Sequence, residues 1–264
     1  MQKSLRWWRL VFVLTLTSCF NSLNTNAQIG FTFSTSNNSY NSIGGTIINT
    51  AAADDVISTN LFLGFTFYYA GGAYTDFRVS SNGFISLGNN TTNSMPTNNL
   101  STTGNGPIIA PLWDDLLVPA NGMSYEVTGA VGSRVLTVQW ANVRWNRAAT
   151  NAIISFQVRF YEGTNVVDFI YDQTNRTPNN ASASIGLSGG GVISDFYSVY
   201  IDGNIDATAT YGSETNWNYR KPYDGDTYTW TPTICFMFLP LPGRLPAMCP
   251  NATTCNKPLS AYRY

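Results

Sequence analysis

The sequence predicts an all-β domain, built as an antiparallel β-sandwich or a jelly-roll-like fold. Short segments alternate apolar and polar residues with a period of two, and Gly and Asn turn signals separate them. No stretch sustains the 3.6-residue apolar period of a helix. Charged residues make up only 11% of the 264 residues, and the helix formers Glu and Lys are scarce.

The first half of the chain predicts strands of increasing clarity. Residues 28–60 are polar, with apolar pairs such as Ile47-Ile48, and predict one or two irregular strands. Residues 61–69 are dense in aromatic side chains and end at Gly71-Gly72, which indicates a strand and a turn. Residues 77–87 place Asn82-Gly83 between two apolar runs, which predicts a β-hairpin.

The second half continues the same pattern after a long polar loop at residues 89–106. Residues 107–118 predict a buried strand bracketed by prolines. The alternation at Leu136, Val138 and Trp140 is that of a half-buried strand. The remaining expected strands are residues 124–127 and 134–145, which pair across a turn at 129–133, then 154–160, 167–171, 184–187, 196–201 and 227–230.

The N-terminus has the pattern of a signal peptide, which we place at residues 1–27. Lys3, Arg6 and Arg9 form a positive region, residues 10–17 are apolar, and small residues end at Ala27. The apolar run is too short to cross a bilayer, and no later run reaches about 18 residues, so we expect no membrane span. These features predict a secreted or outer-surface protein.

A competing processing site lies inside the same leader. Leu16-Thr17-Ser18-Cys19 is similar to a lipoprotein box, which would acylate Cys19. We expect cleavage near Gln28 without a lipid, because the apolar region continues through Phe20. Lipidation of Cys19 is the alternative.

The chain changes composition near its end. Residues 234–264 hold five of the 12 prolines and three of the four cysteines. Cys249 and Cys255 could pair in an oxidising compartment, which leaves Cys235 over. We therefore expect a β domain over residues 28–233 and an atypical, unpacked tail over 234–264, such as truncation or a frame shift would leave.

Composition excludes several classes of function. The chain has no histidine, which removes Ser-His-Asp triads, Cys-His pairs and His-ligated zinc. The leader holds three of the 14 basic residues and none of the 15 acidic ones, so the rest carries a net charge near −4. Without a basic cluster, we expect neither nucleic acid nor an anionic membrane as a partner.

Several ordered blocks stand within residues 63–187: residues 64–69 (GFTFYY), 79–85 (VSSNGFI), 109–115 (IAPLWDD), 135–140 (VLTVQW) and 154–158 (ISFQV). Together these blocks resemble nidogen-type extracellular β domains, as found in secreted surface proteins of Bacteroidetes. This resemblance implies a β-rich adhesion or matrix module, and it brings no catalytic residues with it.

Carboxylates are the main candidates for chemistry. Asp114-Asp115 could divide acid and base roles in a glycosidase, with Glu126 opposite, across a groove lined by Trp113 or Tyr125. Adjacent strand residues point to opposite faces, however. We therefore interpret the pair as a strand end whose carboxylates accept hydrogen bonds.

Two further patterns have a functional and a structural interpretation. Asp202, Asn204 and Asp206, with Thr208 after them, place oxygens at alternate positions as calcium loops do. The comparison lacks the Gly and the bidentate Glu, so an Asx-rich turn is the preferred interpretation. The aromatic residues could form a sugar-stacking platform, but core packing is commoner; they are Trp113, Trp140, Trp145, Tyr68 and Tyr69.

The sequence therefore predicts a secreted, non-catalytic binding or adhesion module, associated with the cell surface or matrix. Its partner is an extracellular glycan or protein that the sequence does not identify. We assign no catalytic, cofactor-binding or metal-ligating residue and expect no cofactor. The alternatives are a secreted carboxylate-dependent glycan hydrolase and a structural spacer from a larger multidomain surface protein.

Overall fold

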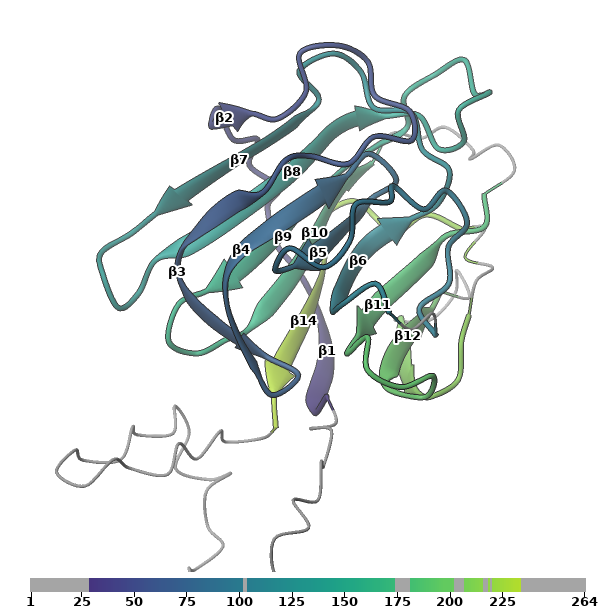
Figure 1. The fold of residues 1–264 in the computed structure, drawn as a ribbon. Helices are drawn as coiled ribbons and strands as arrows, with labels where there is room; N and C mark the ends of the chain where they lie inside the picture. Colours follow the sequence, from purple (N-terminus) through teal and green to yellow (C-terminus); the bar gives the residue numbers. More distant parts are fainter. Residues whose placement is uncertain are drawn as a thin grey trace, which may run out of the picture.

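A computed structural model describes residues 29–101, 104–173, 181–201, 207–215, 218 and 220–233, and these form two packed β-sheets (Figure 1). Every strand pairing in them is antiparallel, and no described residue is helical. The predicted antiparallel β-sandwich is confirmed. The predicted signal peptide and the tail at 234–264 lie outside the described residues.

Each sheet has seven strands, and the chain passes between the two sheets several times. The first sheet has the order β1 (Phe31–Asn37), β14 (Asp226–Pro232), β10 (Val167–Gln173), β9 (Ile154–Tyr161), β8 (Val135–Val143), β7 (Met123–Thr128) and β2 (Thr46–Ile47). The second has the order β13 (Thr208–Tyr211), β12 (Phe196–Tyr200), β11 (Ser184–Ser188), β6 (Ile108–Trp113), β5 (Phe84–Leu87), β4 (Gly72–Ser80) and β3 (Leu61–Tyr69).

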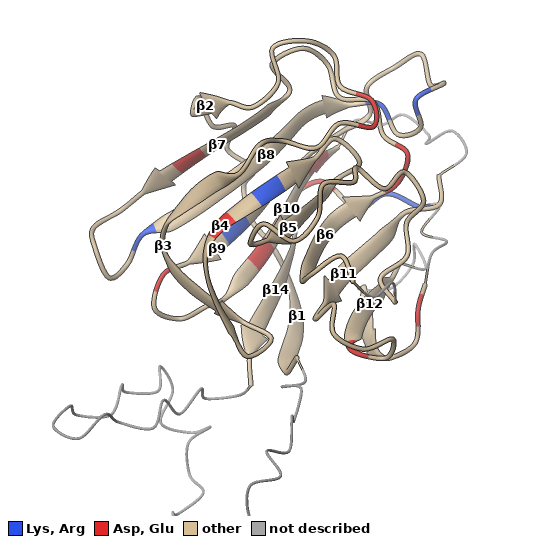
Figure 2. Cartoon of the chain, in the orientation of Figure 1, with Lys and Arg blue, Asp and Glu red and all other residues tan. Residues whose placement is uncertain are grey.

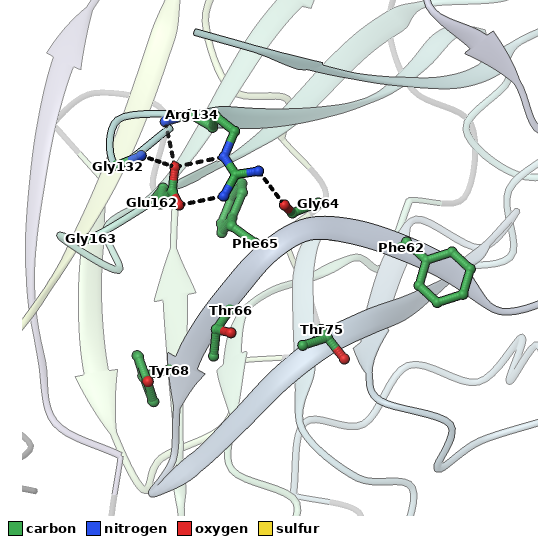
Figure 3. A pocket seen from close by; sticks show the side chains of 10 residues that line it. All are labelled: Phe62, Gly64, Phe65, Thr66, Tyr68, Thr75, Gly132, Arg134, Glu162 and Gly163. Carbon is green, nitrogen blue, oxygen red and sulfur yellow. Dashed lines mark hydrogen bonds and ion pairs between the residues drawn. The ribbon is translucent and has the colours of Figure 1, made fainter. Parts of the chain in front are cut away.

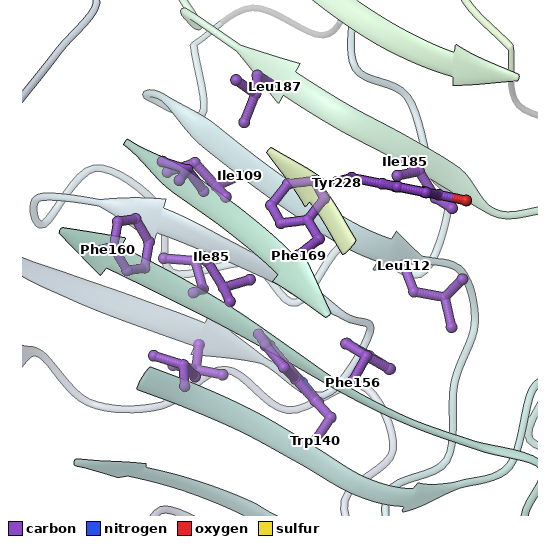
Figure 4. Packing of buried hydrophobic residues seen from close by; sticks show 14 of the residues in the cluster. Ile85, Ile109, Leu112, Trp140, Phe156, Phe160, Phe169, Ile185, Leu187 and Tyr228 are labelled. Carbon is purple, nitrogen blue, oxygen red and sulfur yellow. The ribbon is translucent and has the colours of Figure 1, made fainter. Parts of the chain in front are cut away.

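The core between the sheets follows from the alternation of the sequence. In β9, Phe156, Val158 and Phe160 point inward and are fully buried. They meet residues of the second sheet such as Ile85 and Ile109 (Figure 4). Burying one large apolar side chain contributes about 1.5–3 kcal/mol, so the set of inward-facing residues provides the main driving force for this fold.

Two tight turns of the second sheet depend on left-handed backbone. Ala70 and Gly71 have φ angles of 48° and 76°, as a type I′ turn between β3 and β4 requires. The predicted Asn82-Gly83 hairpin is also present, between β4 and β5. Gly83 has a φ of 77°, and a Cβ there would lie 1.9 Å from the carbonyl oxygen of Leu112. Only glycine fits at that position.

Most strand bounds agree with the prediction to within two residues, and three larger differences remain. β4 begins at Gly72 rather than near residue 77. The sequence did not predict this earlier start, because the first residues of the strand are partly exposed and contain no apolar run. β13 was not predicted, since it is a short and mostly exposed edge strand. The strand expected over residues 107–118 ends at Trp113, where the chain bends at Asp114.

The part of the long polar loop at residues 89–101 covers part of the outer face of the second sheet. Met95 and Leu100 from this loop pack against Phe84 and Trp113, in a small apolar cluster separate from the main core. The indole nitrogen of Trp113 donates a 2.8 Å hydrogen bond to the carbonyl oxygen of Met95. The loop is therefore held by packing as well as by polar contacts.

A second connection crosses the outer face of the first sheet, because β1 and β2 lie at its opposite edges. Gln139 of β8 anchors this connection. Its side-chain oxygen accepts hydrogen bonds of 3.0 Å from the Tyr40 hydroxyl and from the Ile43 amide. The sequence alone predicted only irregular strands here.

The two ends of the described domain lie side by side. The amide of Thr233 donates a 2.9 Å hydrogen bond to the carbonyl oxygen of Gly30, beside the β1–β14 pair. Both ends leave the sandwich at the same side (Figure 1). Among the described residues, no helix is long and apolar enough to cross a membrane.

Candidate functional site

A shallow hollow of about 610 Å³ lies where the β3 edge of the second sheet meets two turns of the first sheet (Figure 3). It opens to solvent on one side. Its walls combine aromatic rings, hydroxyls and one ion pair. The lining residues are Phe62, Gly64, Phe65, Thr66, Tyr68, Thr75, Gly132, Arg134, Glu162 and Gly163.

Strand β3 supplies the floor of the hollow through its outward-facing residues. Phe62, Gly64, Thr66 and Tyr68 alternate with four buried residues of the same strand. Phe62 is 73% exposed, which is unusual for so large an apolar residue. The outward side of β3 thus has the aromatic rings of Phe62 and Tyr68 near its two ends, with Gly64 and the hydroxyl of Thr66 between them.

Gly64 makes a local irregularity in this strand. Its φ of 83° is a left-handed conformation that favours glycine. The register of the β3–β4 pair shifts between Phe62 and Phe67. Such bulges are common at sheet edges and next to functional sites.

Arg134 and Glu162 form the polar rim of the hollow (Figure 3). Nε of Arg134 donates to Oε2 of Glu162 at 2.8 Å, and Nη2 donates to Oε1 at 2.6 Å. Oε2 also accepts the amides of Gly132 and Arg134 at 2.8 and 3.0 Å. Both oxygens of this carboxylate are therefore engaged.

This pairing fixes the charge of Glu162. The hydrogen bond from Arg134 is the largest cause that lowers the pKa of Glu162 from 4.5 to about 2, and the two backbone amides add to it. Glu162 is consequently an anion at neutral pH and a poor proton acceptor. It is suited to hold Arg134 in place.

Contacts from the first sheet also occupy the backbone of the β3 edge. Nη1 of Arg134 donates to the carbonyl oxygen of Gly64 at 2.5 Å. The side-chain oxygen of Asn165 accepts the amide of Tyr68 at 2.9 Å. These two backbone groups are not open to pairing with another strand.

Asp114 is placed as a structural acceptor. The side chain is buried, and its Oδ2 accepts Trp145 Nε1 and the amide of Ser182, both at 2.7 Å. Its Oδ1 accepts the amide of Asp115 at 2.9 Å and the Ser182 hydroxyl at 3.1 Å. The interpretation of Asp114 as a hydrogen-bond acceptor is confirmed, although it lies just after β6 and not within the strand.

Asp115 belongs to a separate acidic cluster with Asp54 and Asp55. One carboxylate oxygen from each lies within 4.8 Å of the others. Burial, and then the charges of Asp55 and Asp54, raise the pKa of Asp115. Arg147 makes a 3.6 Å ion pair with Asp54 at the edge of this cluster. Figure 2 shows the other charged residues distributed over strands and loops, among them the Arg134–Glu162 pair of the hollow.

This cluster could offer three oxygens to a cation, whereas calcium takes six to eight oxygen ligands. The side-chain amide of the nearby Asn82 already forms hydrogen bonds within the protein. Its Nδ2 donates to Asp55 at 2.8 Å and its Oδ1 accepts the amide of Leu116 at 3.1 Å. With one oxygen each, the three carboxylates give three of the six to eight ligands that calcium takes.

The structure places the remaining candidate residues, which are Glu126, the calcium-loop pattern and the aromatic residues, in three different ways. Glu126 lies on β7 and is not among the carboxylates grouped with Asp115. Asp202, Asn204 and Asp206 lie outside the described residues, and Thr208 begins β13. Four of the five aromatic residues are buried, as the preferred interpretation of core packing expects, and Tyr68 lines the hollow. The buried ones are Trp140, Trp145 and Tyr69 in the main core and Trp113 in the small outer cluster.

The sequence analysis did not identify Phe62, Arg134 or Glu162 as site residues. The ion pair joins residues 28 positions apart on different turns, and no spacing rule indicates it. Phe62 did carry a signal. It occupies one of the outward-facing positions of the alternating strand at residues 61–69, where an exposed aromatic residue is unexpected.

A family model described as NIDO related matches residues 30–232. No curated protein and no solved structure shows significant similarity to the chain.

Proposed function

This chain belongs to the NIDO-related family, and from that membership we propose that it is a non-catalytic binding module that works outside the cell. Family relationship to nidogen supports the extracellular setting, and the predicted leader at residues 1–27 supports export. The proposed binding surface is the hollow at the β3 edge. Its partner is an extracellular glycan or protein.

The state of Glu162 is the observation that carries this proposal. It is the carboxylate of the hollow, and both of its oxygens are held by Arg134 and by backbone amides. An acid or base of a glycoside hydrolase must exchange a proton with the substrate near the working pH. A carboxyl with a pKa of about 2 and no unengaged oxygen does not suit that role.

The acidic residues outside the hollow support the same proposal. Glycoside hydrolases place two carboxyls on either side of the substrate, about 5–10 Å apart. Asp114 is buried and engaged in four hydrogen bonds, and Trp113 beside it is buried as well. Asp115 faces two other aspartates within 4.8 Å, which leaves no space for a sugar between them.

Binding is tested with the purified protein on an array of glycans and matrix proteins. We expect binding that Phe62→Ala weakens and that Ile193→Ala leaves unchanged. Ile193 is a matched control, because its 71% exposure is close to the 73% of Phe62 and it does not line the hollow. Equal behaviour of the two variants would place binding elsewhere.

Catalysis is tested with the same preparation on a panel of polysaccharides. We expect no release of reducing ends. Hydrolysis that disappears in Asp115→Asn, with the melting temperature of the variant maintained, would overturn the proposal and favour a carboxylate-dependent hydrolase.

A further inference from the structure

The hollow at the β3 edge is elongated along the strand. Phe62 and Tyr68 are six residues apart on the same side of β3, which corresponds to about 20 Å at 3.3 Å per residue. Thr66 lies between them, and Thr75 comes from the neighbouring strand β4 (Figure 3). A ligand that contacts both rings must therefore be an extended chain.

The chemistry of the surface favours sugars as the units of that chain. Aromatic rings present flat apolar surfaces, and hydroxyl and guanidinium groups fix polar atoms around them. No described residue bonds to the hydroxyls of Thr66 and Thr75. Of the five N–H groups of Arg134, Glu162 and Gly64 engage three, so two remain for a ligand.

The edge of β3 disfavours an extended peptide, which would be the other ligand of this shape. A peptide that adds a strand needs the backbone donors and acceptors of the edge. The carbonyl of Gly64 and the amide of Tyr68 are taken by Arg134 and Asn165. The bulge at Gly64 also breaks the regular spacing of the remaining groups.

The charge of the hollow favours an uncharged ligand. Its one cation, Arg134, is neutralised by the bidentate carboxylate of Glu162. Asp76 of the adjacent strand β4 carries a further negative charge, and its Oδ2 accepts a 2.5 Å hydrogen bond from the side-chain Nδ2 of Asn60. A sulfated or uronic-acid glycan would meet no unpaired positive charge at this site.

From these observations we infer that the β3 hollow binds an uncharged linear glycan, with sugar rings stacked on Phe62 and Tyr68 and sugar hydroxyls bonded to Thr66, Thr75 and Arg134. This inference rests on the proposed binding function and specifies its ligand.

Titration calorimetry of the full chain tests the inference with neutral hexasaccharides of xylose, glucose, mannose and N-acetylglucosamine. Heparin and hyaluronan hexasaccharides and an extended decapeptide provide the competing chemistries. We expect at least one neutral hexasaccharide to bind, and Phe62→Ala to weaken that binding by about 3- to 10-fold. A disaccharide of the same sugar is too short to reach both rings, so its weaker binding should depend on one ring only.

Three variants keep the test interpretable. Thr66→Trp should fill the middle of the hollow and abolish binding, and it removes no side-chain hydrogen bond to another described residue. Thr66→Val removes only the hydroxyl and should weaken binding a few-fold. Ile193→Ala should bind as the unchanged protein does, and unaltered melting temperatures establish that all three variants fold.

The outcomes separate this inference from the proposed function. Binding of the charged glycans or of the peptide, with none of the neutral hexasaccharides, would overturn the glycan inference. If a matrix protein on the array binds through Phe62 while every neutral hexasaccharide fails, the binding function stands and the glycan inference is wrong. Hydrolysis of the hexasaccharides would instead overturn the proposed function.

Discussion

The indole Nε1 of Trp145 donates a 2.7 Å hydrogen bond to the buried carboxylate of Asp114. Trp145 lies in the connection between β8 and β9 of the first sheet, and Asp114 follows β6 of the second. Ser182, ahead of β11, donates to the same carboxylate through its amide and its hydroxyl. One side chain thus connects three segments at this end of the sandwich.

Asp114→Ala should destabilise the domain by about 2–5 kcal/mol, because it leaves several buried donors without an acceptor. Asp114→Asn keeps one acceptor oxygen and should lose less. Urea denaturation followed by tryptophan fluorescence measures both changes. The control is Glu126→Gln on β7, where we expect a change within about 0.5 kcal/mol. An Asp114→Ala variant as stable as the control would show that water replaces the carboxylate.

Glu162→Gln should lower stability at neutral pH and change its dependence on pH. The folded-state pKa of Glu162 is depressed to about 2, below its ordinary value of 4.5. Its ion pair therefore stabilises the fold fully above pH 4.5, and this contribution is lost as the pH falls toward 2. Melting temperatures between pH 2 and 7 should show a steeper acid loss for the unchanged protein than for Glu162→Gln. Parallel curves would contradict the pairing.

Asp115→Asn should stabilise the domain at neutral pH by a few tenths to about 1 kcal/mol, because it removes repulsion from two neighbouring carboxylates. The pKa of Asp115 is raised in the folded state. Folding therefore favours the protonated form, and stability falls as the pH rises above the ordinary pKa of an aspartate. The advantage of the variant should be larger at pH 7 than at pH 4 in urea denaturation. A variant less stable at both values would indicate a favourable role for this carboxylate.

Export should remove residues 1–27 and leave an unlipidated chain that begins near Gln28, because small residues at positions 25–27 follow the apolar region. Intact-mass spectrometry of the exported protein measures this directly. An acylated Cys19 at the N-terminus would show that the lipoprotein site is used instead.

The core strands could be predicted from the sequence because each one contains its own alternation of apolar and polar residues. In β9 the inward Phe156, Val158 and Phe160 alternate with polar residues, and a local pattern of this kind depends on no distant contact. The outward β13 has no such pattern because it buries little surface. The pairing of strands into two sheets is a long-range property, and the alternation alone did not specify it.

The hollow could not be predicted from the sequence, because it too is formed by long-range contacts. Arg134 reaches Gly64, which is 70 positions away, and Tyr68 meets Asn165 across 97 positions. Asn82 illustrates the same limit of prediction, because a local signal indicated its turn but not its distant contact. Its Asn-Gly pair predicted the hairpin correctly, but its side chain also bonds Asp55, and no turn rule indicates that contact.

The adjacency of Gly30 and Thr233 determines how the domain responds to mechanical force. A pull on both flanks acts at one end of the antiparallel β1–β14 pair, so its hydrogen bonds open one after another, as in unzipping. Each such bond resists with only about 1 kcal/mol, whereas strands loaded in shear must break many bonds together. Tension carried from flank to flank therefore peels β1 from the sheet at low load.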